Sequence, residues 1–191
     1  TRSITRYPGR HRANPLVDAL CREGIARVAR SLRKAWKDGR NAAAREDMSL
    51  ASLFGGFALA NAGLGAVHGF SGVVGGMFKA PHGAVCAALL PHVMAANRAA
   101  LQNREPHSPA VARYDEVARL LTGRPGAKAE DGVEWIRELT AAMGIPALGA
   151  CGVARGDVPA IVERTAVASG TKANPIVLSR GELAEILERA I

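Results

Sequence analysis

The sequence predicts an all-α fold, a multi-helix array, from three observations. Alanine is abundant and aromatic residues make up only 4% of the chain, a composition that favours close-packed helices over a β-sandwich. Apolar residues recur at helical spacing, and helix-capping residues precede several of these stretches. Strand signals are nearly absent, and only residues 174–179 (NPIVLS) could form a short extended piece. The 191 residues suffice for one domain with a sizeable core, or for two very small ones.

The first expected helix lies within residues 13–39, where Asn14 can cap its start and Pro15 suits its first turn. Gly39 can end this helix. Its apolar residues recur at roughly helical spacing, which predicts that one stripe of the helix is buried. The stripe consists of Leu16, Leu20, Ile25, Val28, Leu32 and Trp36.

The second expected helix lies within residues 41–63, has Asn41 as its cap, and becomes apolar on all sides after Met48. Such a helix lies in a protein core or in a membrane. From Met48 to Phe78 the sequence has no charged side chain if His68 is neutral. A bilayer needs only ~20 apolar residues, so this stretch is long enough to span one.

Membrane insertion is nevertheless not expected. The stretch is rich in alanine and glycine rather than leucine, so its transfer into lipid releases little free energy. Asn61 and His68 lie inside it, and the other amphipathic helices need a common core. Glycines at GxxxG spacing either let helices approach closely or leave room for a ligand beside the backbone. These glycines are Gly65 with Gly69 and Gly72 with Gly76.

The sequence predicts five further helices after residue 80. One is expected over residues 81–101, starting at Pro81 and bending at Pro91. The others are amphipathic and shorter, and they lie within residues 108–123, 130–144, 156–170 and 179–191. Local signals mark three of their starts. These signals are Ser108 followed by Pro109, Asp157, and the capping-box pair Ser179 and Glu182.

The net charge of +8 comes entirely from residues 1–40, which hold 11 of the 25 basic residues and only three of the 17 acidic ones. Nucleic-acid binding is one interpretation of such a patch. However, Tyr7 and Trp36 are the only aromatic residues in it that could stack on bases. A helix face exposed to solvent, or an arm that docks elsewhere, explains the basic residues better. We therefore rank nucleic-acid binding last among the candidate functions.

The three cysteines, Cys21, Cys86 and Cys151, stand far apart and form no CxxC motif. Their odd number and wide spacing do not suit a disulfide framework, so a cytoplasmic location is the default expectation. Residues 1–13 also lack the apolar centre of a signal peptide.

Two histidines, His68 and His82, bracket a glycine-rich stretch that contains Pro81. Two helices that meet at such a turn could aim both imidazoles at one point, where Zn²⁺ or Fe²⁺ would accept them. Two ligands alone make a poor metal site. From the spacing alone, two hydrogen-bonded core histidines are the simpler interpretation. The glycine-rich run GLGAVHG does not fit GxGxxG and follows no strand, so a dinucleotide loop is not expected there.

The remaining candidates are weaker. Cys86 follows His82 by four residues on the same helix face and could be a third ligand, although a small buried apolar residue is the simpler interpretation. His92 lies about 80° around the helix from His82 and should not converge with it. His11 and His107 fall in polar segments and are expected to face solvent.

Four stretches resemble the iron-containing (group III) alcohol dehydrogenases, with maleylacetate reductase-like relatives included. They are ANPLVDALCREGI (13–25), REDMSLASLFGGFALANAGLGAVHG (45–69), GGMFKAPHGAVCAALLPHVMAAN (75–97) and NPIVLSRGELAEIL (174–187). Their order and spacing also fit, and the likeness extends over residues 13–191. The pattern NAGLGAVH, PHG and LLPHV is far more specific than a lone histidine pair.

This resemblance implies a two-domain enzyme in which an N-terminal α/β domain binds NAD(P) and a helical C-terminal domain carries a divalent metal, Fe²⁺ or Zn²⁺. An Asp, a His four residues after it, and two further histidines hold the metal in such enzymes. The two further histidines match His68 and His82, so the resemblance assigns both as metal ligands. It also implies a small alcohol or aldehyde substrate and a homo-oligomer.

The chain departs from the family pattern in three ways. No Asp-x-x-x-His occurs in it, so two of the four ligands are missing. Residues 1–12 read as a basic arm that does not match the family, followed by a helical metal-binding domain over residues 13–191, and the nucleotide-binding domain is absent. Gly72 stands where many members carry another histidine, which puts a proton relay there in doubt.

We therefore expect the metal-binding domain of an NAD(P)-dependent alcohol dehydrogenase that by itself binds metal weakly and is inactive. It would use NAD(P) only with the missing α/β domain or chain as its partner. No residue is assigned to catalysis or to cofactor binding. The alternative is a non-catalytic helical interaction module or a split-gene remnant.

Overall fold

The computed structural model describes residues 14–191, and within this range every regular element is a helix. The all-α prediction is therefore confirmed, and residues 174–179 form an irregular connection instead of a strand. The predictions for the arm at residues 1–12 and for His11 lie outside the described residues. The α-helices are α1 (Pro15–Lys37), α2 (Ala42–Ala62), α3 (Ala66–Phe78), α4 (His82–Arg104), α5 (Pro109–Thr122), α6 (Ala129–Ala142), α7 (Val158–Val167) and α8 (Arg180–Ala190). The short 3-10 turns are η2 (Leu148–Cys151), η3 (Arg155–Asp157) and η4 (Thr171–Ala173).

Four of the α-helices, α1, α2, α5 and α8, begin at capping residues that the sequence predicts. The side chain of Asn14 accepts a hydrogen bond from Val17 N at 3.0 Å, and Asn41 does the same for α2. At α8, Ser179 and Glu182 form the expected capping box, each accepting a hydrogen bond from the other's backbone N–H. The prediction for Asp157 was wrong, because its carboxylate accepts a hydrogen bond from Ala154 N and so caps η3 rather than α7.

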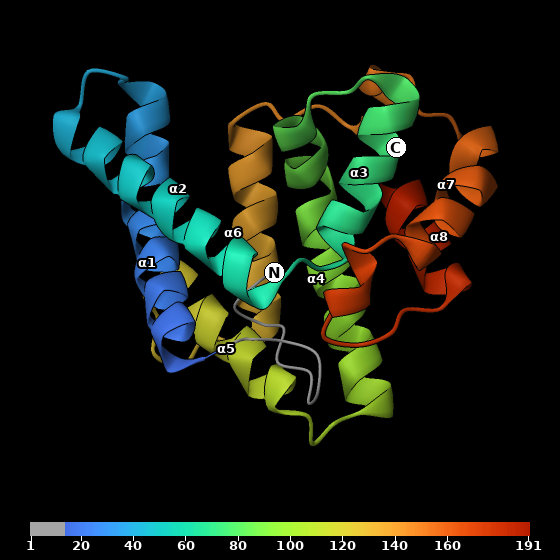
Figure 1. The fold of residues 1–191 in the computed structure, drawn as a ribbon. Helices are drawn as coiled ribbons and strands as arrows, with labels where there is room; N and C mark the ends of the chain where they lie inside the picture. Colours follow the sequence, from blue (N-terminus) through green and yellow to red (C-terminus); the bar gives the residue numbers. More distant parts are fainter. Residues whose placement is uncertain (1–13) are drawn as a thin grey trace.

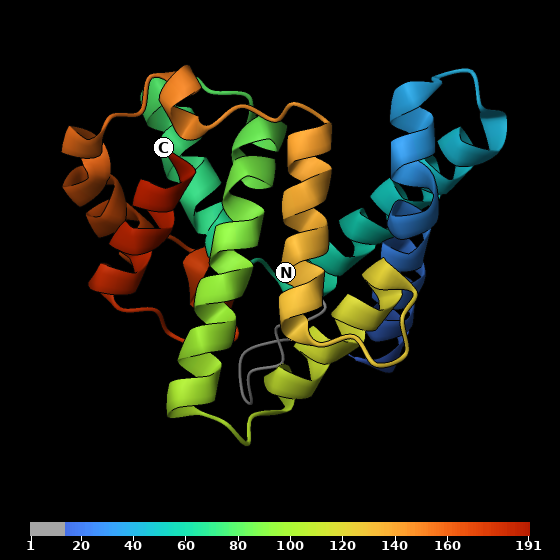
Figure 2. The same cartoon turned by 180° about the vertical axis from the view of Figure 1, so that it is seen from behind.

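Helix α4 lies in the middle of the molecule, and α3, α6 and α8 pack around it (Figures 1 and 2). Val85, Leu89, Val93 and Leu101 of α4 are completely buried. Pro91 lies inside α4 and is also buried. This central position accounts for the apolar character of α4, since residues on most sides of the helix contact protein.

Helices α1 and α2 form an antiparallel pair at one side of the molecule (Figure 1). They share a small core of Val17, Ala58 and Ala62, separate from the main core. The predicted buried stripe of α1 is wrong at its ends, because Leu16 and Trp36 are 79% and 51% exposed. Its other four members are half-buried. Helix α2 packs mainly against α1, and α1 packs against α2 and α5, whereas the central α4 packs against α3, α5, α6 and α8.

The burial expected for α2 is also wrong. Leu53, Phe57 and Leu59 are between 42% and 50% exposed, although the sequence reads as apolar on all sides. A single helix neighbour, α1, can cover only one face of α2.

The apolar run over residues 48–78 is broken into two helices. Gly63 has a φ of 76°, a conformation that favours glycine, and α3 leaves α2 at an angle of 100°. By length and composition α4 could cross a membrane, and α2 with α3 could do so only as this bent pair. In α4 such a composition is also expected of the central helix of a bundle.

Candidate metal centre

Helices α3 and α4 bring His68 and His82 together. His68 lies in the first turn of α3, and His82 is the first residue of α4. Lys79 adopts the left-handed conformation, with a φ of 50°, and ends α3. Pro81 then leads into α4. The two imidazole rings lie with their centroids 5.5 Å apart and their planes at 49°.

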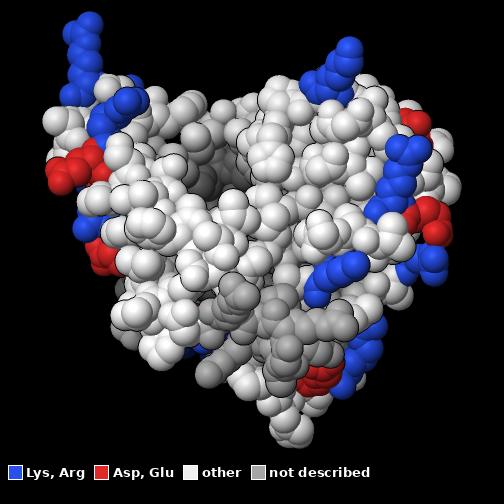
Figure 3. Space-filling model, in the orientation of Figure 1, with Lys and Arg blue, Asp and Glu red and all other residues white. Residues whose placement is uncertain are grey.

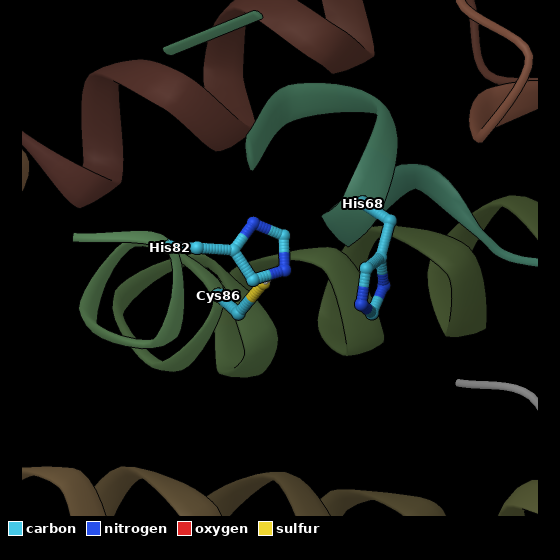
Figure 4. Close-up of side chains that lie close together, drawn as sticks. All are labelled: His68, His82 and Cys86. Atoms are coloured by element: carbon cyan, nitrogen blue, oxygen red, sulfur yellow. Dashed lines mark hydrogen bonds between the residues drawn. The ribbon is translucent and has the colours of Figure 1, made fainter. Parts of the chain in front are cut away.

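The Cys86 side chain completes a cluster of three potential metal ligands. One turn after His82 on α4, its Sγ lies 3.5 Å from His82 Nε2. One ligand atom from each of His68, His82 and Cys86 lies within 4.8 Å of the others (Figure 4). His82 is exposed, whereas the other two are half-buried, so an ion could enter from solvent.

The other described histidines do not join this cluster. His92 is half-buried in a separate cavity of about 190 Å³, which Arg137, Glu185 and Arg189 also line. Burial, with Arg137 and Arg189 adding to it, lowers the pKa of His92 below its ordinary value. His107 is exposed after α4. Both positions confirm the expectations from the sequence.

A groove of about 260 Å³ runs from α1 and α2 to His68. Its walls are mainly apolar, from residues such as Val28, Phe54 and Ala58, and they include Cys21. A hollow lies between the α1–α2 pair and the remaining helices in Figure 3, and its visible wall carries no Lys, Arg, Asp or Glu. His68 therefore belongs both to the ligand cluster and to an apolar groove that could receive a small organic molecule.

The glycine-rich stretch divides into packing and open positions. A Cβ on Gly69 would lie 1.9 Å from Thr171 Oγ1, so close approach of η4 requires glycine there. At Gly72 and Gly76 a Cβ would meet nothing within 4 Å. Close packing therefore accounts for Gly69, whereas the space beside Gly72 and Gly76 is open.

A buried amide pair holds the start of α3 and was not predicted from the sequence. Asn174 Oδ1 accepts hydrogen bonds from Ala66 N at 3.1 Å and from Asn97 Nδ2 at 3.2 Å. Asn174 Nδ2 donates to Asn97 Oδ1 at 2.6 Å and to Ile176 O at 2.8 Å. The only sequence signal was the position of Asn174 before Pro175 in NPIVLS, which also marks ordinary turns.

The three side chains offer the donor atoms that transition metals accept. Imidazole suits Zn²⁺, Fe²⁺ and Co²⁺, and a thiolate favours the softer of these ions. The close spacing of two imidazoles and one thiol therefore fits a divalent ion of this class. Asp and Glu do not contribute to the cluster within residues 14–191.

Comparison with known proteins shows which family this chain resembles. Residues 4–191 match the family described as "Fe-containing alcohol dehydrogenase family, C-terminal". The 1,3-propanediol dehydrogenase of Citrobacter freundii is 37% identical over 184 residues, which cover 93% of this chain and 45% of that protein. A crystal structure of 1,3-propanediol oxidoreductase superposes with a TM-score of 0.86 at 33% identity, covering 100% of this chain and 49% of the other.

The structure of a maleylacetate reductase from Agrobacterium tumefaciens is similar with a TM-score of 0.73 at 22% identity, over 93% of this chain and 46% of the other, and shares the fold. The chain thus spans about half the length of the relatives it matches. From the helical architecture, the family match and the identity to the propanediol enzyme together, this chain belongs to the iron-containing alcohol dehydrogenase family and corresponds to the C-terminal domain of its members.

Proposed function

We propose that this chain is the metal-binding part of an NAD(P)-dependent alcohol dehydrogenase, with His68 and His82 as two ligands of Fe²⁺ or Zn²⁺. The observation that carries the proposal is the 5.5 Å separation of the two imidazole rings, on two different helices of a chain of this family. When bound, such an ion supplies Lewis acidity that stabilises negative charge on an alcohol oxygen during hydride transfer to nicotinamide.

The residues of this chain would orient the ion and the substrate. His68 is anchored by α3, whose start is tied to Asn174, and the apolar groove beside it would exclude water from a small alcohol or aldehyde. The open space at Gly72 and Gly76 would leave room for the substrate beside α3, the helix that carries His68.

The first experiment measures metal content. Anaerobically purified chain, dialysed to equilibrium against Fe²⁺ or Zn²⁺, is expected to bind about one ion weakly, as a single incomplete site would. Replacing His68 and His82 with alanine together should reduce the bound metal to background. His92→Ala and His107→Ala are matched controls, since both histidines lie outside the cluster, and both variants should bind metal normally. Undiminished metal in the double variant would refute the proposal.

A complete reaction would need parts that this chain does not hold. The sequence has no Asp-x-x-x-His, so we propose that these two ligands and the NAD(P) site come from an α/β domain or partner chain. The purified chain should then oxidise neither 1,3-propanediol, which the relatives' names suggest, nor another small alcohol with NAD(P). Turnover by the chain alone would contradict this part of the proposal.

A second candidate is a non-catalytic helical interaction module, which the exposed Leu53, Phe57 and Leu59 of α2 favour. The same face would serve a homo-oligomer. Metal content separates the two candidates, because an interaction module needs no ion. We also propose a cytoplasmic location, since Cys21, Cys86 and Cys151 are all present as thiols.

A further inference from the structure

The position of Cys86 on α4 gives it the geometry of a ligand. It follows His82 by one helical turn, so the two side chains project from the same face of the helix. Its Sγ lies 3.5 Å from His82 Nε2, and Figure 4 shows the sulfur next to the His82 ring, with the His68 side chain nearby on α3. Two consecutive turns of one helix and the start of another therefore present three donor atoms to one small volume.

One distance in the cluster already matches a tetrahedral zinc site. With Zn–S of about 2.3 Å and Zn–N of about 2.05 Å, two ligands at the tetrahedral angle stand roughly 3.5 Å apart. The Sγ to Nε2 distance of 3.5 Å already equals this edge. The largest separation in the cluster is within 4.8 Å, and two imidazole nitrogens on one zinc ion stand roughly 3.4 Å apart. The ligand atoms therefore need to move closer by at most about 1.4 Å, from 4.8 Å to roughly 3.4 Å, which rotation of the two imidazole rings would supply.

We propose that Cys86 is a third metal ligand, and that His68, His82 and Cys86 together bind one zinc ion in this chain. This proposal rests on the proposed role of His68 and His82 as metal ligands. It adds the Cys86 thiolate, which changes the ion that the site prefers. A thiolate favours Zn²⁺ and Co²⁺ over harder ions such as Mg²⁺ and Mn²⁺. Three protein ligands leave the fourth tetrahedral position open, which is the arrangement of catalytic rather than structural zinc sites.

Binding through sulfur has a defined proton balance. The Cys86 thiol loses its proton as the metal–sulfur bond forms, so one proton enters solvent and the sulfur keeps its oxidation state. The contact between Sγ and His82 Nε2 serves as a hydrogen bond in the metal-free chain. The ion replaces that hydrogen bond with two metal–ligand bonds.

The experiment uses Co²⁺ as a spectroscopic probe and Zn²⁺ for affinity. Reduced, metal-free chain is titrated with Co²⁺, and the thiolate-to-cobalt charge-transfer band in the near ultraviolet is recorded. The chain should show this band and release one more proton per bound ion than Cys86→Ala does. Cys151→Ala is the matched control, since Cys151 is also a half-buried thiol but lies outside the cluster and the groove, and it should keep the band. In competition with a chelator, Cys86→Ala should bind Zn²⁺ at least about tenfold more weakly.

Each outcome decides the inference. Co²⁺ bound without the charge-transfer band, with Cys86→Ala unchanged in affinity, would overturn it while the histidine pair stood. Two results would overturn both the inference and the proposed function. One is metal binding that is unchanged in His68→Ala and His82→Ala, and the other is a folded chain that binds no metal. Protection of Cys86 from alkylation by Zn²⁺, lost in the double histidine variant, would support it. Circular dichroism of each variant checks that it has folded.

Discussion

Gly69 and Thr171 approach so closely that a Cβ on Gly69 would lie 1.9 Å from Thr171 Oγ1. The threonine cannot easily turn away, because its hydroxyl donates a hydrogen bond to Thr165 O at 2.7 Å. The contact holds α3, the helix that carries His68, against η4. The residue next to the proposed ligand is therefore glycine for a steric reason.

Gly69→Ala should lower the free energy of unfolding by about 1–3 kcal/mol, because the added methyl overpacks this contact. Thr171→Ala in the same chain should restore part of the loss by removing the hydroxyl. Gly72→Ala is the matched control, since its Cβ would meet nothing within 4 Å, and it should stabilise the helix by roughly 0.5–1 kcal/mol. Urea unfolding measures all three, and equal stability of the Gly69 and Gly72 variants would contradict the steric explanation.

Asn174→Ala should destabilise the chain and weaken metal binding together. The substitution leaves the N–H of Ala66 and the Asn97 amide without their buried partner, at about 1–3 kcal/mol for each unsatisfied group. Because Ala66 begins α3, disorder there should also displace His68. Asn103→Ala, on the exposed end of α4, is the control. Unfolding midpoint and Zn²⁺ affinity are the measurements, and a loss of stability with unchanged affinity would show that α3 keeps its position without the amide pair.

Two phenylalanines distinguish the core helix from the peripheral one. Phe70 of α3 is completely buried, and Phe70→Ala should cost about 3–5 kcal/mol of unfolding free energy. Phe57 of α2 is 47% exposed, so Phe57→Ala should change stability by less than about 1 kcal/mol. Comparable losses in denaturant unfolding would mean that something covers the outer face of α2, and gel filtration would then reveal the assembly.

Asp47 should make the stability of the α1–α2 pair dependent on pH. Its hydrogen bonds with Arg30 and Ser31, together with nearby Arg27, hold the pKa of the Asp47 carboxyl well below its ordinary value of 3.8. A carboxyl with a lowered pKa stabilises the folded chain fully above pH 3.8, and this contribution is lost as the pH falls through the folded-state pKa.

Asp47→Asn should therefore be less stable than the unmodified chain at neutral pH, and the difference should shrink below pH 3.8. Thermal unfolding followed by circular dichroism across this range measures both curves. A difference that stays constant into acid would mean that the charge of Asp47 contributes little. Added salt should weaken the effect only in part, because the Asp47 side chain is only 13% exposed.

The helices could be predicted because their signals are local. Asn14, Asn41 and Ser179 each accept a hydrogen bond from a backbone N–H three residues later, so the cap and its partner lie in the same short stretch. Asp157 misled the prediction because two helical turns begin within a few residues of it, and its carboxylate serves the earlier one. The histidine pair was recognisable only from the family resemblance, since spacing alone also suits two core histidines.

By itself the sequence determined the all-α class, most helix starts, the separation of His92 from His82 and the family. Only the tertiary structure decided which apolar faces are covered, leaving Phe57 of α2 in solvent, and that Cys86 and His68 share one volume. The physical reason is the distance along the chain over which the deciding interactions act. Caps and helical periodicity depend on hydrogen bonds within one or two turns, whereas burial and convergence depend on which helix packs beside which. For the candidate site that choice is made by contacts between residues far apart in the chain, such as Ala66 with Asn174.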